Sequence, residues 1–351
     1  MFKNVRVFVT GHTGFKGSWL TAWLKSEGAA VTGLALPPEP GSVNLFEAAA
    51  IADGMTSVFG DIRDLRLVHE TVTRAKPEII FHLAAQPLVR RSYADPTGTF
   101  ATNVMGTVNV LEAARHCDSV RAFVCVTTDK VYLDREWPWG YRETDRLGGK
   151  DPYSASKACA ELVAACYRQT MLGGPGGPRL ATVRGGNVIG GGDWSEDRLI
   201  PDIVRSIIAG KPVVLRNPDA IRPWQHVLEL VHAYLTLGSK LLDGQADIDC
   251  AWNFGPAQEG ELSVEALLRG FLQAWGTDIP IEIQRSVLPE TQVLRLDASQ
   301  ARSLLGWKPR LDARETIALT AHWYRRFHGG DEPRQLVSEA IGSYRRRGCA
   351  A

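Results

Sequence analysis

The sequence predicts an α/β fold with a doubly wound parallel sheet and a smaller C-terminal α/β substrate domain. Short runs rich in β-branched residues alternate with helical segments over the first half of the chain, which is typical of successive βα units. Glycine-rich or polar stretches follow several of these runs directly, at the edge where a parallel sheet binds its ligand. The chain has 351 residues, enough for one large domain and one smaller one.

The overall charge is almost balanced, with 40 basic and 39 acidic residues, which argues against general binding to nucleic acid or to a membrane surface. The six cysteines show none of the short spacings of a zinc site, so we expect reduced thiols and no metal ion. No apolar run is long enough to span a bilayer, and no leader peptide is visible. We therefore expect a soluble, cytoplasmic protein.

The first apolar run, residues 5–9, leads into three glycines with GxxGxxG spacing and then into a helical segment. Such a loop allows a tight turn and a close approach to a pyrophosphate, and the helix N-terminus attracts the phosphates. Three glycines alone could form a plain turn, but their place after a first strand favours a dinucleotide. We therefore predict a Rossmann-type domain whose cofactor contacts include Gly11, Thr13, Gly14, Phe15, Lys16 and Gly17.

The second predicted strand, residues 30–36, ends without the acidic or basic residue that separates NAD from NADP, so this stretch leaves both open. After the third strand, Asp61 and Ile62 are placed to face an adenine ring. The alternative for Asp61 is that it caps the helix predicted at 65–75. The same residue could also serve both roles, contact with the adenine ring and capping of the helix.

The fourth predicted strand, residues 79–86, carries His82 inside an apolar run, which favours a core histidine over a catalytic one. Small residues at the end of this strand suit the close passage of a cofactor. We predict cofactor contacts here from Leu83, Ala84, Ala85 and Gln86.

Two groups of titratable residues are expected to meet at one place. The strand that ends at Thr127 opens into the triplet Thr128-Asp129-Lys130, and a later helix carries Tyr153 and Lys157 on one face. A tyrosine is a poor base at neutral pH because its pKa is near 10. A nearby ammonium and a positive nicotinamide ring would favour the phenolate, which could then take a proton from a hydroxyl group.

The βα alternation is lost after about residue 194. We therefore assign residues 1–186, with about 224–258, to the cofactor-binding domain, and residues 187–223, with about 259–351, to the substrate domain. Helices are predicted at 99–116 and from about 202 to 209, and a strand at 212–216.

These motifs resemble the extended short-chain dehydrogenase/reductase family, and within it the CDP-glucose 4,6-dehydratases. The resemblance covers about three quarters of the chain nearly continuously. Among the matching segments are GHTGFKGSW (11–19), TDK (128–130), DPYSASKACAELV (151–163), GNVIGGGDW (186–194) and RNPDAIRPWQHVLE (216–229).

The resemblance implies NAD as cofactor and a net loss of water from a nucleotide-linked hexose. Tyr153 would deprotonate the 4-hydroxyl, Thr128 would bind it, and Lys157 could also hold the nicotinamide ribose. Asp129 would help the 6-hydroxyl to leave, and Lys130 stands where dTDP-glucose dehydratases carry a glutamate base. The alternative for Asp129 and Lys130 is a surface ion pair of little consequence.

Asn187, Arg198 and Arg222 match the family positions around the sugar diphosphate, and Arg216 is a weaker candidate near the nucleobase. Gln86 and Thr128 are the other predicted substrate contacts. The resemblance also implies a homodimer in which helices 99–116 and 153–170 form a four-helix bundle with their symmetry mates.

Two other functions share part of this pattern. A nucleotide-sugar 4-epimerase has the same fold, NAD, tyrosine and lysine, but normally carries a small residue in place of the Asp129–Lys130 acid/base pair. A non-catalytic NAD-binding regulator or scaffold usually lacks the tyrosine or the strand-end threonine, and both are present here.

Overall fold

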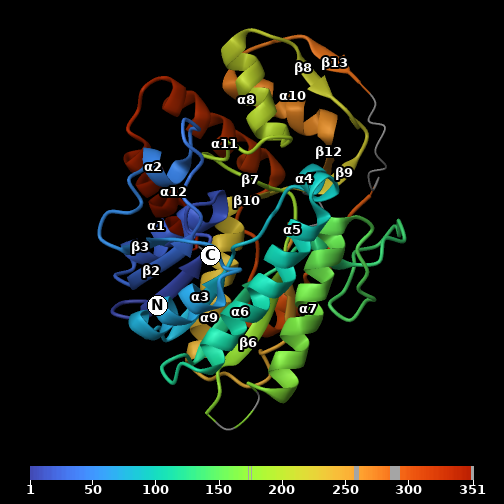
Figure 1. Cartoon of the computed structure of the whole chain (residues 1–351). Helices are drawn as coiled ribbons and strands as arrows, with labels where there is room; N and C mark the ends of the chain where they lie inside the picture. Colours follow the sequence, from blue (N-terminus) through green and yellow to red (C-terminus); the bar gives the residue numbers. More distant parts are fainter. Residues whose placement is uncertain (173, 175, 257–260, 285–292, 349–351) are drawn as a thin grey trace.

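The computed structural model describes residues 1–172, 174, 176–256, 261–284 and 293–348. Its centre is a seven-stranded parallel sheet in the order β11-β6-β5-β4-β1-β2-β3, which confirms the predicted doubly wound fold (Figure 1). The order reverses between β1 and β4, where such sheets bind ligands. The strands are β1 (Arg6–Thr10), β2 (Ala30–Ala35), β3 (Thr56–Phe59), β4 (Ile79–His82), β5 (Ala122–Val126), β6 (Arg179–Arg184) and β11 (Ala251–Asn253).

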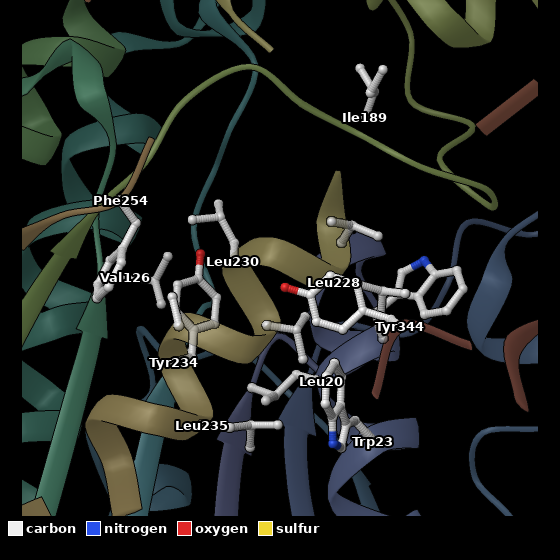
Figure 2. Close-up of a cluster of buried hydrophobic side chains, with 14 of the residues drawn as sticks. Leu20, Trp23, Val126, Ile189, Leu228, Leu230, Tyr234, Leu235, Phe254 and Tyr344 are labelled. Atoms are coloured by element: carbon white, nitrogen blue, oxygen red, sulfur yellow. The ribbon is translucent and has the colours of Figure 1, made fainter. Parts of the chain in front are cut away.

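Helices cover both faces of the sheet because successive strand residues point to opposite sides. Val7 and Val9 belong to one buried cluster, with α1 (Phe15–Ser26) and α9 (Val227–Leu242). Phe8 belongs to the other, beneath α3 (Leu65–Ala75), α6 (Gly106–Arg115) and α7 (Pro152–Thr170). Figure 2 shows the first cluster, in which Leu20 and Trp23 of α1 gather with Leu228 and Leu235 of α9.

The helix predicted at 99–116 is longer and less regular than expected. It begins as α5 (Pro96–Phe100), passes through the π-helical segment η1 (Ala101–Met105) and continues as α6. Pro96 starts α5 because the first turn of a helix does not need the amide hydrogen that proline lacks. The wider turn of η1 lies against α7, close to the strand ends.

The second lobe stands above the sheet in Figure 1. Its α8 (Leu199–Ala209) begins three residues before the expected start, because Pro201 fits the first turn of a helix. Two small two-stranded sheets complete this lobe, and a third lies between it and the main sheet (Figure 1). They pair β7 (Val188–Ile189) with β10 (Gln225–His226), β8 (Val213–Leu215) with β13 (Ile281–Ile283), and β9 (Ile221–Pro223) with β12 (Glu261–Ser263), beside α10 (Val264–Trp275).

The C-terminal helices return to the first lobe. α12 (Pro333–Arg347) packs against α1, α2 (Leu45–Ala48) and α11 (Ala313–His328), as seen at the left of Figure 1. The predicted division into two domains at residues 186, 224 and 258 stays a prediction. Among the described residues, no helix combines the length and apolar character needed to cross a membrane.

Candidate active site

The glycine loop has the close packing that its spacing predicts. Gly11 has a positive φ of 75°, and a Cβ there would lie 2.8 Å from the Ala84 amide nitrogen. A Cβ on Gly17 would lie 2.0 Å from the Gly11 carbonyl oxygen. α1 begins after Gly14 with no side-chain cap, which leaves its first-turn amides available to an anion. The loop therefore fits the pyrophosphate of a dinucleotide.

The adenosine side of the loop differs from one expectation. Asp61 does not cap α3: its carboxylate accepts the Arg63 amide at 2.8 Å and the Arg63 side chain at 2.6 Å. Asp64, three residues later, is the cap and accepts the Leu67 amide at 3.1 Å. Two acidic residues precede this helix, and the turn after β3 brings only the second into capping position. Ile62 is buried, and Thr13 donates to the Leu36 carbonyl at the end of β2.

The end of β4 is held by a buried polar set. Thr10 Oγ1 accepts the Leu83 and Ala84 amides at 3.1 Å and contacts His82 Nδ1 at 2.7 Å. His82 Nε2 lies 3.0 Å from Thr107 Oγ1, so both ring nitrogens have partners. His82 is therefore a satisfied core histidine, as predicted, and burial lowers its pKa to about 3.

Gln86 is fixed by the π-helical segment. Asn103 accepts the Gln86 amide at 2.8 Å and donates to its carbonyl at 3.1 Å, and it also donates to Ser156 Oγ on α7 at 2.9 Å. The Gln86 side chain donates to Thr99 and accepts the Leu88 amide. Asn103 thus connects the end of β4 to the helix that carries the predicted tyrosine.

The predicted catalytic residues Thr128 and Tyr153 come together. The Thr128 side chain is close enough to the Tyr153 phenol to act on its pKa, and its hydroxyl donates to Asp129 Oδ1 at 3.0 Å. Tyr153 is 8% exposed, and burial raises its pKa to about 12, with the neighbouring Thr128 hydroxyl opposing this rise. In the protein alone, desolvation of the phenolate therefore outweighs the neighbours that favour it. The predicted effect of a nicotinamide ring on this pKa stays a prediction.

Lys157 lies one turn after Tyr153, and its Nζ donates to the Val126 carbonyl at 2.9 Å. Burial lowers the pKa of Lys157, while Cys125 and Glu161 oppose that change. One of the three ammonium protons is used by Val126, which leaves two for other acceptors. The side chain is therefore fixed at the strand end with donor capacity remaining.

Asp129 and Lys130 have different surroundings, so the surface ion pair is wrong for Asp129. Asp129 is 2% exposed, and burial raises the pKa of its carboxyl group. Its Oδ2 has no hydrogen-bond partner among the residues that the structure describes, and a Cβ on Gly186 would lie 1.5 Å from that atom. Lys130 belongs to the same short turn, η2 (Asp129–Val131), and is exposed. Glycine at position 186 is what makes room for the buried carboxyl group.

Lys16 of the glycine loop belongs to the same group of charges. Burial lowers its pKa to about 7, and the positive charges of Lys157 and Arg198 act in the same direction. Asp129 and Asp193 act against them. The glycine loop, the strand-end triplet and the second lobe therefore converge on one site.

Two of the predicted substrate arginines, Arg198 and Arg216, have carboxylate partners. Arg198 donates to Asp193 at 2.8 Å. Arg216 pairs with Asp197 at 3.1 Å, and so does Arg90 of the helix α4 (Val89–Ala94). The remaining candidates are the mostly buried Arg222 and the half-buried Asn187, whose φ is 38°.

Sequence reasoning missed Asp193, Asn103 and Glu161. Asp193 is 3% exposed and lies within the matching segment 186–194. Glu161 follows Lys157 by one helical turn, which was a visible signal of a shared face. Among the described residues, no group of three or more histidines, cysteines or acidic residues could hold a metal ion.

Comparisons with known proteins agree with this geometry. The model of the NAD dependent epimerase/dehydratase family matches residues 7–251. The CDP-glucose 4,6-dehydratase of Salmonella typhimurium is 47% identical over 98% of this chain and 97% of that protein. The UDP-glucose 4-epimerase of Mycolicibacterium smegmatis is 29% identical over 92% of this chain and 99% of that protein.

A solved structure shows the same fold with a cofactor. The dTDP-glucose 4,6-dehydratase of Streptomyces venezuelae, crystallised with NAD, has a TM-score of 0.78 and 27% identity, covering 94% of this chain and 100% of that one. The family model spans well over half of the present sequence. The chain therefore belongs to the NAD dependent epimerase/dehydratase family.

Proposed function

We propose that the protein is an NAD-dependent nucleotide-sugar 4,6-dehydratase that converts CDP-glucose to CDP-4-keto-6-deoxyglucose. The proposal is supported by the 47% identity to a CDP-glucose 4,6-dehydratase along nearly the whole chain. It is also supported by a site that joins the glycine loop to the tyrosine and the strand-end triplet. The net reaction is the loss of one water molecule from the hexose.

NAD, when bound, would supply the redox chemistry of a reaction in which the sugar is oxidised at C4 and reduced at C6. The cofactor would be held by the glycine loop, Asp61, Ile62, the 83–86 segment, Thr127 and Lys157. Thr128 would orient the 4-hydroxyl, and Tyr153 would take its proton. A fixed ammonium at Lys157 and the positive ring of the cofactor would stabilise the phenolate that the protein alone disfavours.

The observation that carries the dehydratase over the epimerase is the buried Asp129. Epimerisation needs proton transfer at the 4-oxygen only, whereas elimination needs an acid for the departing 6-hydroxyl and a base for the hydrogen on C5. Burial raises the pKa of Asp129, which favours the protonated acid that can donate to a leaving oxygen. Lys130 follows directly, and its exposed side chain would have to reach C5 of the sugar to act as the base. Asn187, Arg198 and Arg222 would hold the diphosphate of the substrate, and Arg216 would lie near its nucleobase.

The test is incubation of the purified protein with CDP-glucose and catalytic NAD, followed by mass spectrometry. We expect the mass of one water to be lost. Tyr153→Phe should lower the rate about 10²- to 10⁴-fold, the usual range for general acid–base catalysis. Tyr167→Phe on the same helix, whose hydroxyl bonds Glu112 at 2.6 Å, is the matched control and should keep its activity.

Asp129→Asn separates the two candidate reactions. This variant should no longer release water. The oxidation at C4 should remain and should be detected as reduced cofactor. An unchanged mass with a new sugar stereoisomer would identify an epimerase. A protein that binds NAD and alters no CDP-, dTDP-, GDP- or UDP-sugar would overturn the enzymatic proposal.

We also propose a cytoplasmic homodimer. The helices predicted to form its interface expose apolar side chains, including Phe100, Met105 and Leu162, the last with 60% exposure. All five described cysteines are free thiols, as in a reducing compartment. Light scattering should give the mass of a dimer at micromolar concentration, and Leu162→Glu should shift it to the monomer. A monomeric wild-type protein would contradict the interface.

A further inference from the structure

Two side chains one turn apart tie α7 to the end of β5. Lys157 Nζ donates to the Val126 carbonyl at 2.9 Å, and the Glu161 carboxylate accepts the Thr127 hydroxyl at 2.5 Å. Residues four apart in a helix share a face, and Tyr153 lies on that face one turn earlier. These two ties therefore fix how far the Tyr153 phenol stands from the strand end.

Glu161 is buried, and its carboxylate accepts three hydrogen bonds from residues at or near the sheet. Besides Thr127, it accepts the Thr182 hydroxyl at 2.7 Å and the Arg184 guanidinium at 2.8 Å. Burial alone would raise the pKa of Glu161, but Arg184 and the two hydroxyls outweigh it, so this pKa is lowered. Glu161 thus stays ionised and joins α7 to both β5 and β6.

Arg184 extends the connection to the far side of the strand-end triplet. A second guanidinium nitrogen donates to the Tyr132 hydroxyl and to the Glu143 carbonyl, each at 2.9 Å. The guanidinium carbon lies 5.1 Å from the centre of the Tyr132 ring. Tyr132 in turn donates to Asn253 Oδ1 at 2.6 Å. Thr127 precedes residues 128–130 and Tyr132 follows them, so the Glu161–Arg184 pair holds both ends of this segment.

We propose that Glu161 and Arg184 are positioning residues that hold the segment Thr128–Lys130 at a fixed place relative to Tyr153. The proposal rests on the dehydratase function proposed above. Thr128 serves the oxidation at C4, whereas Asp129 and Lys130 serve the elimination, and all three lie on one short turn. Loosening either end of that turn should therefore uncouple the elimination from the oxidation before it affects substrate binding.

The test compares Glu161→Gln with the wild type in kcat, in KM for CDP-glucose and in the ultraviolet absorbance of reduced cofactor. We expect kcat to fall about 100-fold, the scale of a displacement of about 1 Å, with KM nearly unchanged. Reduced cofactor should accumulate on the variant because elimination falls behind oxidation. Lys157 also loses a negative neighbour, so the alkaline limb of the kcat/KM profile should move to lower pH.

Thr182 provides a milder variant in case Glu161→Gln does not fold. Thr182→Val removes one donor to Glu161 and should lower kcat about fivefold, the equivalent of one hydrogen bond, with the same build-up of reduced cofactor. Thr182→Ser keeps the hydroxyl and should behave as the wild type.

Glu229→Gln is the matched control, because Glu229 is an equally buried carboxylate with three donors, far along the chain on α9. It should change stability without accumulating reduced cofactor. If Glu161→Gln and Thr182→Val lose activity only in proportion to the unfolded fraction, with the wild-type pH profile and no reduced cofactor, the positioning role is overturned. A wild-type protein that does not dehydrate CDP-glucose would instead overturn the proposed function.

Discussion

Two buried glutamates, Glu161 and Glu229, hold distant segments together in different ways. Glu161 on α7 receives two hydroxyls and the guanidinium of Arg184 at 2.8 Å. Glu229 on α9 receives the backbone amides of Arg310 and Leu311 and the hydroxyl of Tyr344, at 2.6 to 2.8 Å. Both side chains are almost completely buried, so the difference lies in the donors.

Burial acts to raise the pKa of both carboxyl groups, but the net shifts have opposite directions. The pKa of Glu161 is lowered despite its burial, whereas burial raises the pKa of Glu229 to about 6. The Arg310 guanidinium acts on Glu229 through its charge, while its carbon lies 5.1 Å from the centre of the Tyr344 ring and its Nη2 lies 3.0 Å from His232 Nε2. Neutral donors alone therefore do not keep a buried carboxylate ionised as firmly as a guanidinium does. Glu161, next to the candidate active site, therefore stays ionised, whereas the ionisation of Glu229, next to the C-terminal helix α12, changes with pH near 6.

The largest effect is expected from Arg184→Met, which leaves Glu161 buried without its cation. Loss of one partner of a buried ion pair costs about 3–5 kcal/mol, and urea denaturation at neutral pH measures it. Arg310→Met is the comparison, and it should cost clearly less because Glu229 keeps both backbone amides. Equal losses in the two variants would break the distinction between the clusters.

The second effect is a pH dependence that belongs to Glu229 only. Its pKa rises from 4.5 to about 6 on folding, so its contribution to stability is fully present below about pH 4.5 and is lost as the pH rises through about 6. The shift corresponds to at most about 2 kcal/mol.

Glu229→Gln removes this dependence. The stability advantage of the wild type over this variant should therefore shrink between pH 4.5 and pH 6, as measured by thermal unfolding across that range. A difference that is constant with pH would show that Glu229 is as firmly ionised as Glu161.

The smallest effect is expected from single hydroxyl deletions. Tyr344→Phe removes one of three donors to Glu229 and should cost about 1 kcal/mol with no change in turnover per folded molecule. Tyr132→Phe removes a hydroxyl that bonds Asn253 and Arg184, and it should cost a similar amount of stability but also lower kcat. Equal turnover in the two variants would show that the Tyr132 hydroxyl does not contribute to catalysis.

Most of the fold and the main motifs of the site could be predicted from the sequence, because each motif is a short run of residues at or near the end of a strand or on one helix. The glycine spacing after residues 5–9, the triplet after β5 and the tyrosine–lysine pair on α7 each follow from a run of a few residues. A parallel sheet then brings these segments to one edge, whatever lies between them. The convergence of Lys16, Asp129 and Tyr153 required no knowledge of side-chain contacts.

What the sequence could not predict are contacts between residues far apart in the chain. Arg184 meets Glu161 across 23 positions, and Asn103 meets Ser156 across 53. No local period encodes these pairs, because packing of α7 on β5 and β6 decides them. The cap of α3 was missed for a different reason: Asp61 and Asp64 are chemically equal, and only the turn between them selects one.

The π-helical segment at 101–105 also limits which insertions and deletions the chain can tolerate. A π turn holds one residue more than the α turn that it replaces. Deleting one residue here would rotate everything on one side by about 100°, the step of an α-helix. Asn103 would then lose its hydrogen bonds to Gln86 or to Ser156. The end of β4 and the helix α7 would no longer be held at a fixed distance from each other. Surface loops lengthen at little cost, but this stretch has a residue count that the site itself enforces.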